Sequence, residues 1–473
     1  MGNPKGFLTI NKKEAGYRPV HERVLDFGEV EQTLNSEDRK LQASRCMDCG
    51  VPFCHWACPL GNKMPEWQDL IYKGKWKEAA ELLQTTNDFP EFTGRICPAL
   101  CEKACVLNYE ENSITIRENE AAVMEYAFEQ GYVTPNPPKT RTGKKVAVIG
   151  GGPAGLAAAN QLNKRGHSVT VFEKDNAVGG LLRFGIPDFK LNKLVIDRRL
   201  ALLEAEGIEF KVSTEVGKDI KGTEILKKYD AVVITIGAGQ PRDLPVEGRD
   251  INGVYFALQF LQQQNHLIKG DKIAEKDIIS AKGKNVLVIG GGDTGSDCVG
   301  TSIRQGAKSV TQIEILPKPS EEYVPATMWP NWPNTLRTSS SHKEGCNRRW
   351  NLATKRFIAG EDGKLSGVEV VEVAWGVDEN GKYGMKEIGT PEIIEAELVT
   401  LAMGFVQPVH EGLLNELGVA YDGRGNVAID ANTTQSSVKK VFAAGDAASG
   451  ASLVVRAIAA GRKTAEEVDK FLK

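Results

Sequence analysis

Most of the cysteines of this chain lie in two closely spaced runs near its start. Cys46–Cys58 has the pattern C-x2-C-x4-C-x3-C and precedes Pro59, and Cys97–Cys105 has the pattern C-x3-C-x3-C. The first pattern is close to the iron–sulfur run C-x2-C-x2-C-x3-C-P, whose fourth Cys binds the other cluster in two-cluster proteins. Of the nine cysteines, only Cys298 and Cys346 lie elsewhere. In a reducing compartment, such a concentration of thiols favours metal binding over disulfides.

Two [4Fe–4S] clusters need eight ligands, one more than the seven cysteines of the two runs supply. Crossed pairing of the runs predicts two ligand groups, with a carboxylate as the eighth ligand. Glu120 is the candidate for this ligand, and Glu118 is the second choice. The first group is Cys46, Cys49, Cys54 and Cys105, and the second group is Cys58, Cys97, Cys101 and Glu120.

Two alternatives to this assignment stay open. Glu120 could be salt-bridged or capping, as a buried Glu usually is. The thiols could also bind structural zinc, which prefers four ligands in a tetrahedral array. One zinc would leave three of the seven cysteines unused, and two zincs would need His ligands where only His55 is nearby.

A glycine-rich turn follows the short apolar run Val146–Ile149. Its glycines stand in G-x-G-x-x-G register, which allows a tight turn, close approach of a pyrophosphate and close packing of helix on strand. An acidic residue, Glu173, ends the next strand and suits a ribose hydroxyl pair. We therefore expect an FAD site here, the alternative being an ordinary tight turn. Its predicted contacts are Gly150, Gly152, Pro153, Ala154, Gly155, Glu173, Lys174, Gly180 and Leu181.

A second feature of the FAD site lies near the C-terminus, in VFAAGDAASGASLVV. Gly445 and Asp446 resemble the Gly-Asp motif of two-dinucleotide flavoproteins, whose Asp holds the ribityl chain beside a helix start. Ser452 and Leu453 are expected to contribute further contacts. Since Gly150 would touch the same cofactor, the FAD-binding domain must be discontinuous. The alternative is that Asp446 merely caps a helix.

The second glycine-rich turn, after Val286–Ile289, predicts a site for a nicotinamide dinucleotide. The acid after its next strand favours NADH, because it would repel a 2′-phosphate. Three nearby basic residues could serve a 2′-phosphate instead, so the choice between NADPH and NADH stays open: Arg304, Lys308 and Lys318. The predicted contacts are Gly290, Gly292, Asp293, Thr294, Gly295 and Glu314, and two further glycines, Gly237 and Gly404, are expected at domain crossovers near the cofactors.

The elements that must position these sites indicate an α/β protein with two doubly wound, Rossmann-like domains, one inserted in the other. A mostly helical iron–sulfur domain precedes them, since Met64–Leu83 and Ile116–Phe128 have apolar residues at helical spacing. A Pro-rich, basic linker separates it from the sheets. The expected domains are residues 1–140 for the clusters, 141–265 with 400–473 for FAD, and 266–399 for NAD(P)H.

Composition excludes several other classes of function. The net charge is −3, and the sequence has no basic stripe of the kind that binds nucleic acid. No apolar run approaches the roughly 18 residues of a membrane helix, and the N-terminal residues lack a secretory h-region. We therefore expect a cytoplasmic protein. Cys298 has no C-x-x-C partner, which argues against dithiol exchange, and we expect both outlying cysteines to be packing residues.

Five segments of the chain resemble the small (β) subunit of glutamate synthase. They are Gly6–Phe27, Arg45–Ala79, Thr86–Leu107, Gly291–Val310 and the Trp-Pro pair in Met328–Pro333. The similarity extends over the whole chain. Dihydropyrimidine dehydrogenase and other NAD(P)H:acceptor flavoproteins share the cluster and nucleotide motifs, whereas the Trp-Pro region is more particular to glutamate synthase.

The resemblance implies that NADPH or NADH reduces FAD and that two [4Fe–4S] clusters pass single electrons onward. The acceptor would be a large subunit with FMN and a 3Fe–4S cluster, which makes L-glutamate from L-glutamine and 2-oxoglutarate in a hetero-oligomer. No catalytic side chain is named, because hydride passes between cofactors. The alternatives are an NAD(P)H:acceptor flavoprotein with another partner, ferredoxin:NADP reductase-like or pyrimidine-reducing, and a scaffold without activity.

The chain departs from the family pattern near its end. The family usually has a basic pair after the Gly-Asp motif and a Trp in the following helix, where this chain has Ala447, Ala448 and Arg456. These differences concern the flavin contacts.

Overall fold

The iron–sulfur part of the chain is helical, as its sequence predicts. The computed structural model describes residues 2–377 and 381–473. The long apolar periodicity after Met64 forms two helices, because Gly74 takes a left-handed conformation between them. The elements are α1 (Gly6–Thr9), α2 (Val20–Arg23), α3 (Ser36–Ser44), α4 (Phe53–Ala57), α5 (Met64–Tyr72), α6 (Trp76–Thr86), α7 (Pro90–Ile96), α8 (Leu100–Ala104), the 3₁₀ helix η1 (Val106–Glu110) and α9 (Arg117–Glu129).

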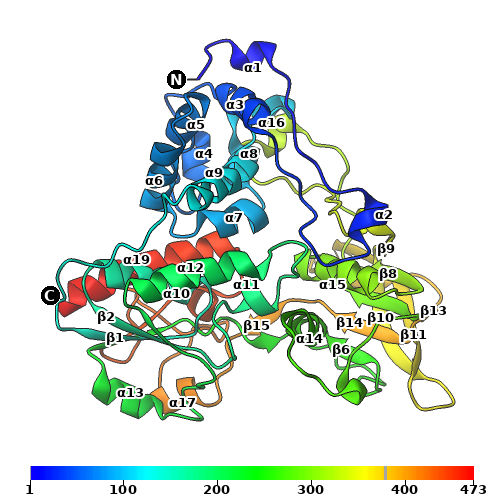
Figure 1. The fold of residues 1–473 in the computed structure, drawn as a ribbon. Helices are drawn as coiled ribbons and strands as arrows, with labels where there is room; N and C mark the ends of the chain where they lie inside the picture. Colours follow the sequence, from blue (N-terminus) through cyan, green and yellow to red (C-terminus); the bar gives the residue numbers. More distant parts are fainter. Residues whose placement is uncertain (1, 378–380) are drawn as a thin grey trace.

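These helices have a hydrophobic core of their own. Trp67, Ile71, Leu83 and Met124 are fully buried in it, and they come from α5, α6 and α9. Figure 1 shows helices α3 to α9 standing above the two sheets, whereas α2 lies beside the second domain. The clusters would therefore lie in a compact unit beside the nucleotide-binding domains.

The first sheet is parallel, with the order β16-β4-β1-β2-β3. Its C-terminal strand β16 pairs with β4, which itself pairs with β1, so both ends of the two-domain region share one sheet. Helices α10 and α19 pack against each other on it (Figure 1). The elements are β1 (Lys145–Ile149), α10 (Pro153–Lys164), β2 (Ser168–Phe172), α11 (Leu181–Phe184), α12 (Lys193–Ala205), β3 (Glu209–Lys211), α13 (Gly222–Lys228), β4 (Ala231–Ile234), α17 (Leu413–Leu417), β16 (Val441–Ala443), α18 (Asp446–Ser449) and α19 (Val454–Leu472).

The second sheet is also parallel, with the order β6-β14-β7-β8-β9. The chain enters and leaves it through a small antiparallel pair, β5 with β15. The elements are β5 (Gln240–Pro241), β6 (Val254–Phe256), α14 (Ala257–Lys269), η2 (Glu275–Asp277), β7 (Asn285–Ile289), α15 (Asp293–Arg304), β8 (Ser309–Ile313), α16 (Pro325–Met328), η3 (His342–Glu344), β9 (Asn347–Arg349), β14 (Leu398–Leu401) and β15 (Phe405–Gln407).

The pairing of β6 bears on the expected domain limits. We expected residues up to 265 to belong with FAD, yet β6 pairs with β14 in the second sheet. The sheets thus favour a crossover at β5 and β15 instead, and the other limits remain predictions.

An antiparallel sheet extends the second domain, and the sequence analysis did not foresee it. It joins β10 (Leu352–Ala359), β11 (Leu365–Val377), β12 (Tyr383–Glu387) and β13 (Glu392–Glu395). Figure 1 shows β11 running along the outer edge of this domain. No helix among the described residues is long and apolar enough to cross a membrane.

Two buried ion-pair networks connect the helical part to the sheets. Arg199 of α12 pairs with Glu91 of α7 through two bonds of 2.6 and 3.0 Å. Glu344 accepts from Arg23, in α2, and from Arg304, in α15, both at 2.6 Å. Breaking a buried pair of this kind leaves an uncompensated charge, so these contacts hold the domains in a defined arrangement.

Candidate functional site

The first predicted ligand group surrounds one cavity. Its four thiols come from the loop before α4, from α4 itself and from the end of α8. The cavity is otherwise lined mainly by apolar side chains, among them Phe53, Leu107 and Ile114. The lining thiols are those of Cys46, Cys49, Cys54 and Cys105. A cavity of soft ligands with an apolar wall is suited to an iron–sulfur cluster.

Two left-handed residues shape the turns that carry these thiols. Asp48 (φ 53°) lies between Cys46 and Cys49, and Ala99 (φ 63°) lies in the second run. This conformation is uncommon for residues other than glycine, and it clusters at functional sites. In each turn the left-handed residue's amide donates to a thiol, that of Asp48 to Cys46 and that of Ala99 to Cys97. Such bonds to ligand sulfurs tune cluster potentials.

The second predicted ligand group is separate from the first. The pKa values of Cys58, Cys97 and Cys101 are raised, first by burial and then by neighbouring charges that include Glu120. The pKa values of the first-group thiols Cys46 and Cys54 are raised first by burial and then by other charges that include Cys105 and Cys49. The four thiols of the first group thus surround one cavity, and the assignment of the two groups to two clusters stays a prediction.

Glu120, on α9, is buried and held in one orientation. Its Oε1 accepts hydrogen bonds from Asn87 Nδ2 at 2.8 Å and from Thr93 Oγ1 at 2.6 Å. Burial raises the pKa of this carboxyl to about 7. Both bonds go to Oε1, and ligation of iron through Oε2 stays a prediction. The second choice, Glu118, accepts instead from the Leu34 amide and pairs with Arg39.

The zinc alternative can be compared with the same geometry. His55, the nearby imidazole, lies 3.2 Å from Glu66. Within residues 2–377 and 381–473, no three His, Cys, Asp or Glu side chains are spaced to hold a single metal ion.

The first glycine-rich turn has the geometry that a dinucleotide fold requires. Gly150 has φ 105°, and a Cβ there would lie 2.4 Å from the Thr235 carbonyl oxygen. A Cβ on Gly155 would lie 2.0 Å from the Gly150 oxygen, so helix and strand are in close contact. Gly152 caps α10, which begins at Pro153 and Ala154. The amides at this helix start can receive a phosphate.

The acid after β2 faces this turn. Glu173 Oε2 accepts from the Gly151 amide at 2.8 Å, and its Oε1 accepts from the Asp175 amide. Gly180 lies against Gly152, and the neighbouring Lys174 and Leu181 are exposed. The predicted contacts therefore meet at one end of β1 and β2.

The C-terminal motif reaches the same place from the other end of the sequence. A Cβ on Gly445 would lie 2.7 Å from the Ala154 Cβ, at the start of α10. Asp446 begins α18 and accepts from Ser452 Oγ at 3.3 Å, and burial raises its pKa to about 6. Leu453 caps the N-terminal end of α19. This placement is the one that a shared FAD site requires.

The departures from the family pattern differ in burial. Ala447 is fully buried and its carbonyl accepts from the Val427 amide. Arg456 is exposed on α19, and Ala448 is half-buried.

The second glycine-rich turn repeats the geometry of the first. A Cβ on Gly290 would lie 2.3 Å from the Ala402 carbonyl oxygen, and one on Gly295 would lie 2.3 Å from the Gly290 oxygen. Gly292 caps α15, whose first residues are Asp293 and Thr294. The two turns thus occupy equivalent positions in the two parallel sheets.

Each of the two crossover glycines follows the second strand in the order of its sheet. Gly237 (φ 72°) comes after β4, and Gly404 (φ 79°) comes after β14. The Gly404 carbonyl accepts from the Arg242 amide in the β5–β15 crossover. Their proximity to cofactors stays a prediction.

The sequence analysis missed one contact at the first ligand group. Trp329 of the Trp-Pro pair donates from Nε1 to the Cys105 carbonyl at 3.0 Å, and its ring lies 4.8 Å from that of Phe53. A segment of the nucleotide domain therefore covers the cluster region. The Trp-Pro pair was the available signal, but its contact partner is distant in sequence.

Comparison with known proteins identifies the parts. Residues 144–461 match the pyridine nucleotide-disulphide oxidoreductase family, and residues 23–132 match dihydropyrimidine dehydrogenase domain II, 4Fe-4S cluster. The structure of Mycobacterium tuberculosis FprA in complex with NADPH superposes with a TM-score of 0.54 at 17% identity, over 70% of this chain and 84% of that one. This likeness confirms the two-dinucleotide fold.

Curated relatives match from end to end. The glutamate synthase [NADPH] small chain of Mycobacterium tuberculosis is 47% identical over 100% of this chain and 96% of its own length. The Bacillus subtilis small chain is 42% identical over 100% and 99%. The glutamate synthase [NADH] of Schizosaccharomyces pombe is 43% identical over 98% of this chain and 22% of its own length. With its cluster region and two dinucleotide turns in place, the chain belongs to the glutamate synthase small chain family of flavin- and iron–sulfur-dependent oxidoreductases.

Proposed function

We propose that this chain is the electron-input subunit of a glutamate synthase. The observation that carries the proposal is that one chain combines two dinucleotide turns with two separate ligand groups. In this assignment a large subunit carrying FMN and a 3Fe–4S cluster forms L-glutamate from L-glutamine and 2-oxoglutarate. The assembly is a hetero-oligomer in the cytoplasm, where a reducing environment keeps the thiols available.

The residues would hold the cofactors as follows. The turn at Gly150 and the acid Glu173 would bind the adenosine and phosphate end of FAD, and Asp446 would bind its ribityl chain. The turn at Gly290 would bind NAD(P)H. When bound, the flavin would accept hydride and the clusters would carry single electrons to the partner.

The protein's own contribution is positioning. The buried pairs Glu91–Arg199 and Arg23–Glu344–Arg304 fix the helical part against the two sheets. Such fixed geometry keeps donor and acceptor sites at constant separation. No side chain is assigned a proton-transfer role.

The first test is a spectrum and iron assay of the anaerobically purified chain. We expect roughly eight irons per chain, as two [4Fe–4S] clusters require, and bleaching of the flavin by NADH or NADPH. Cys54→Ser should lose about four irons. Cys346→Ser, outside both groups, is the matched control and should retain them.

The second test adds a large subunit. Nucleotide oxidation that depends on both L-glutamine and 2-oxoglutarate supports the proposal. Flavin bleaching without such turnover would point to an NAD(P)H:acceptor flavoprotein with another partner. Zinc in place of iron, with flavin that neither nucleotide bleaches, would contradict the proposal and leave the scaffold alternative.

A further inference from the structure

A short segment of the first domain is held by the helices of the second. This joint segment, residues 184–190, runs from the end of α11 toward α12, and Figure 1 shows α11 between α12 and α15. Phe184 stacks on the ring of His266 in α14, with the ring centroids 4.7 Å apart. The neighbouring Asn265 is buried and donates from Nδ2 to the carbonyls of Phe184 at 3.0 Å and Ile186 at 3.1 Å. The start of the joint segment is therefore fixed to α14.

The far end of the joint segment packs on α15. Phe189 is 1% exposed, and a Cβ on Gly300 would lie 2.8 Å from its Cζ, so the lack of a side chain on the helix makes room for the ring. The guanidinium of Arg304 lies 3.9 Å from the centre of the same ring. The Phe189 carbonyl accepts from the Val30 amide at 3.0 Å, so the N-terminal segment also meets the two domains here. One face of α15 is thus buried against the first domain.

Lys190, the last residue of the joint segment, adds a charge to this contact. Its ammonium pairs with the carboxylate of Asp297 in α15, whose side chain is 9% exposed. Burial disfavours the charge of Lys190, yet the carboxylates of Asp297 and Asp293 outweigh burial and raise the pKa of its amine. The next lysine, Lys193, pairs within its own domain, with Asp188 at 3.3 Å. Lys190 is therefore an ionised group of the first domain that binds a helix of the second.

The helix that Lys190 contacts also carries the second glycine-rich turn. Gly292 caps α15, and Asp293 is its first residue. On the other side of the turn, a Cβ on Gly291 would overlap the Glu314 carboxylate. A dinucleotide binds at the turn that begins such a helix, so the place of α15 sets the place of the nucleotide relative to the first sheet.

We propose that Lys190 is a positioning residue for hydride transfer, which fixes α15 and the NAD(P)H turn relative to the FAD-binding domain through Asp297. The inference rests on the proposed function, because it concerns the transfer between the two cofactors of the same subunit. Such a reaction is sensitive to geometry, since a misplacement of about 1 Å can cost about 100-fold in rate. Removing one partner of a buried pair leaves an uncompensated charge, which destabilises the single arrangement of the two domains.

The test compares variants of the full-length holoprotein by anaerobic stopped-flow measurement of flavin reduction at saturating nucleotide. Lys190→Met keeps the length of the side chain without its charge, and we expect the limiting rate to fall about 10- to 100-fold. Lys190→Arg keeps the charge and should recover most of the rate. Lys190→Met combined with Asp297→Asn should lose no more than the slower single variant, because the two side chains act as one pair.

Two further measurements separate positioning from loss of binding or of structure. Calorimetric titration with NAD⁺ and with NADP⁺ should give the same affinities for Lys190→Met as for the unaltered protein, and the flavin and iron contents should be equal. Hydrogen–deuterium exchange of backbone amides should become faster in α14 and α15 and stay unchanged in α10 and α19, since a helix that has lost a buried contact opens more readily.

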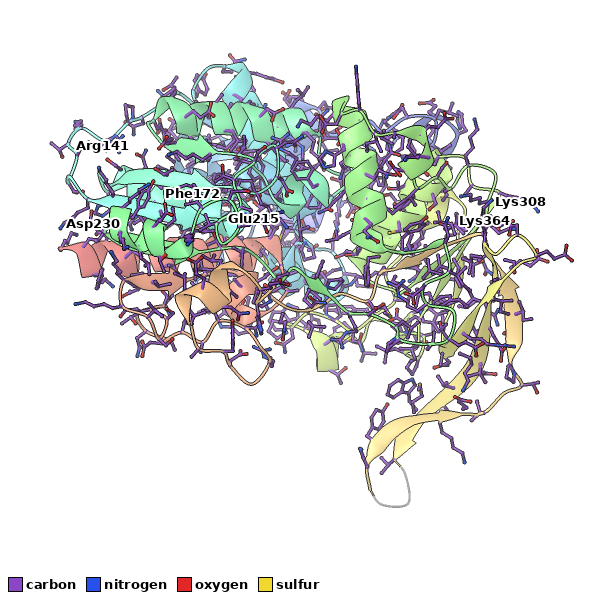
Figure 2. The ribbon with its side chains drawn as sticks, turned by 90° about the horizontal axis from the view of Figure 1, so that it is seen from below. Arg141, Phe172, Glu215, Asp230, Lys308 and Lys364 are labelled. Atoms are coloured by element: carbon purple, nitrogen blue, oxygen red, sulfur yellow. The ribbon has the colours of Figure 1, made fainter. Side chains whose placement is uncertain are left out.

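Two other lysines of the second domain are matched controls. Lys269 Nζ donates to Asn176 Oδ1 of the first domain at 2.9 Å, which is an exposed contact across the same boundary. Lys364 is exposed, and Figure 2 shows it on the side of the second domain away from Phe172 of the first sheet. Lys269→Met and Lys364→Met should leave the limiting rate unchanged, because exposed charge contacts contribute little.

An unchanged limiting rate in Lys190→Met would overturn the inference, as would a loss of nucleotide affinity equal to the loss of rate or a failure of Lys190→Arg to recover. If Lys190→Met loses its flavin, Asp297→Asn removes the same pair from the second domain and decides the question by the same criteria. A slower Lys190→Met without glutamine-dependent turnover by any variant would support the inference while contradicting the proposed function. Flavin that neither nucleotide reduces in the unaltered protein would overturn both.

Discussion

Replacement of Glu120 by Ala tests the non-cysteine ligand most directly. Glu120 is 6% exposed, and its Oε1 accepts from Asn87 and Thr93, which are 1% and 2% exposed. If its second oxygen binds iron, the variant leaves the second group with three thiols. We expect iron to fall from about eight to about four per chain, since each [4Fe–4S] cluster usually takes four ligands.

The same change also has a cost in folding free energy. Ala removes the acceptor that Asn87 and Thr93 share. Asn87 keeps its bond to Thr93 Oγ1 at 2.7 Å, and Thr93 keeps only long contacts of 3.4 Å to backbone carbonyls, so the loss should cost about 1–3 kcal/mol. Glu120→Gln keeps an acceptor oxygen at this position and should unfold close to the original protein. Glu120→Gln is therefore the reference variant that keeps an acceptor for Asn87 and Thr93, and the stability of Glu120→Ala is compared with it.

The assay combines iron content, electron paramagnetic resonance of the reduced protein, and thermal unfolding. Glu118→Ala is the matched control, because it also removes a hydrogen-bonded carboxylate from α9 and should keep about eight irons. Retention of about eight irons and of both cluster signals by Glu120→Ala would refute Glu120 as a ligand.

Three further changes test other parts of the site. Gly150→Ala places a Cβ 2.4 Å from a backbone oxygen at φ 105°, so flavin content should be lost while iron remains. Burial lowers the pKa of His342 to about 4, so protonation of this side chain should destabilise the folded state by roughly 1–2 kcal/mol as pH falls from about 6.5 toward 4. The melting temperature should therefore fall over this pH range, and it should fall less in His342→Gln. Trp329→Phe removes the hydrogen bond to the Cys105 carbonyl, so iron of the first group should be released several-fold faster in air, whereas Trp332→Phe should not change that rate.

The dinucleotide turns could be predicted because their signals are local. Strand, glycines and helix follow one another within a few residues, and the steric demand of each turn is met by the glycines themselves. Gly150 and Gly290 indeed leave no room for a Cβ. The helical nature of the N-terminal part was predictable for the same reason, since periodicity along the chain reports a buried face.

Other features depended on contacts between distant segments. The sequence placed Arg304 near the second turn, yet its side chain is buried against Glu344 and cannot reach a ligand. The pairing of β6 with β14 and the antiparallel sheet around β11 were likewise not foreseen. A strand's partner is set by the whole fold, whereas its hydrophobic pattern reports only that one face is buried.

The sequence by itself determined the kinds of cofactor site, because thiol spacing and glycine register are local requirements of the ligands. It also determined the family, through segments distributed along the whole chain. Only the tertiary structure decided that Arg304 is buried against Glu344, that Trp329 contacts the Cys105 carbonyl, and that Glu314 lies against the second glycine-rich turn. The physical reason is that burial and ion pairing between distant segments decide which charged side chains remain available to a ligand.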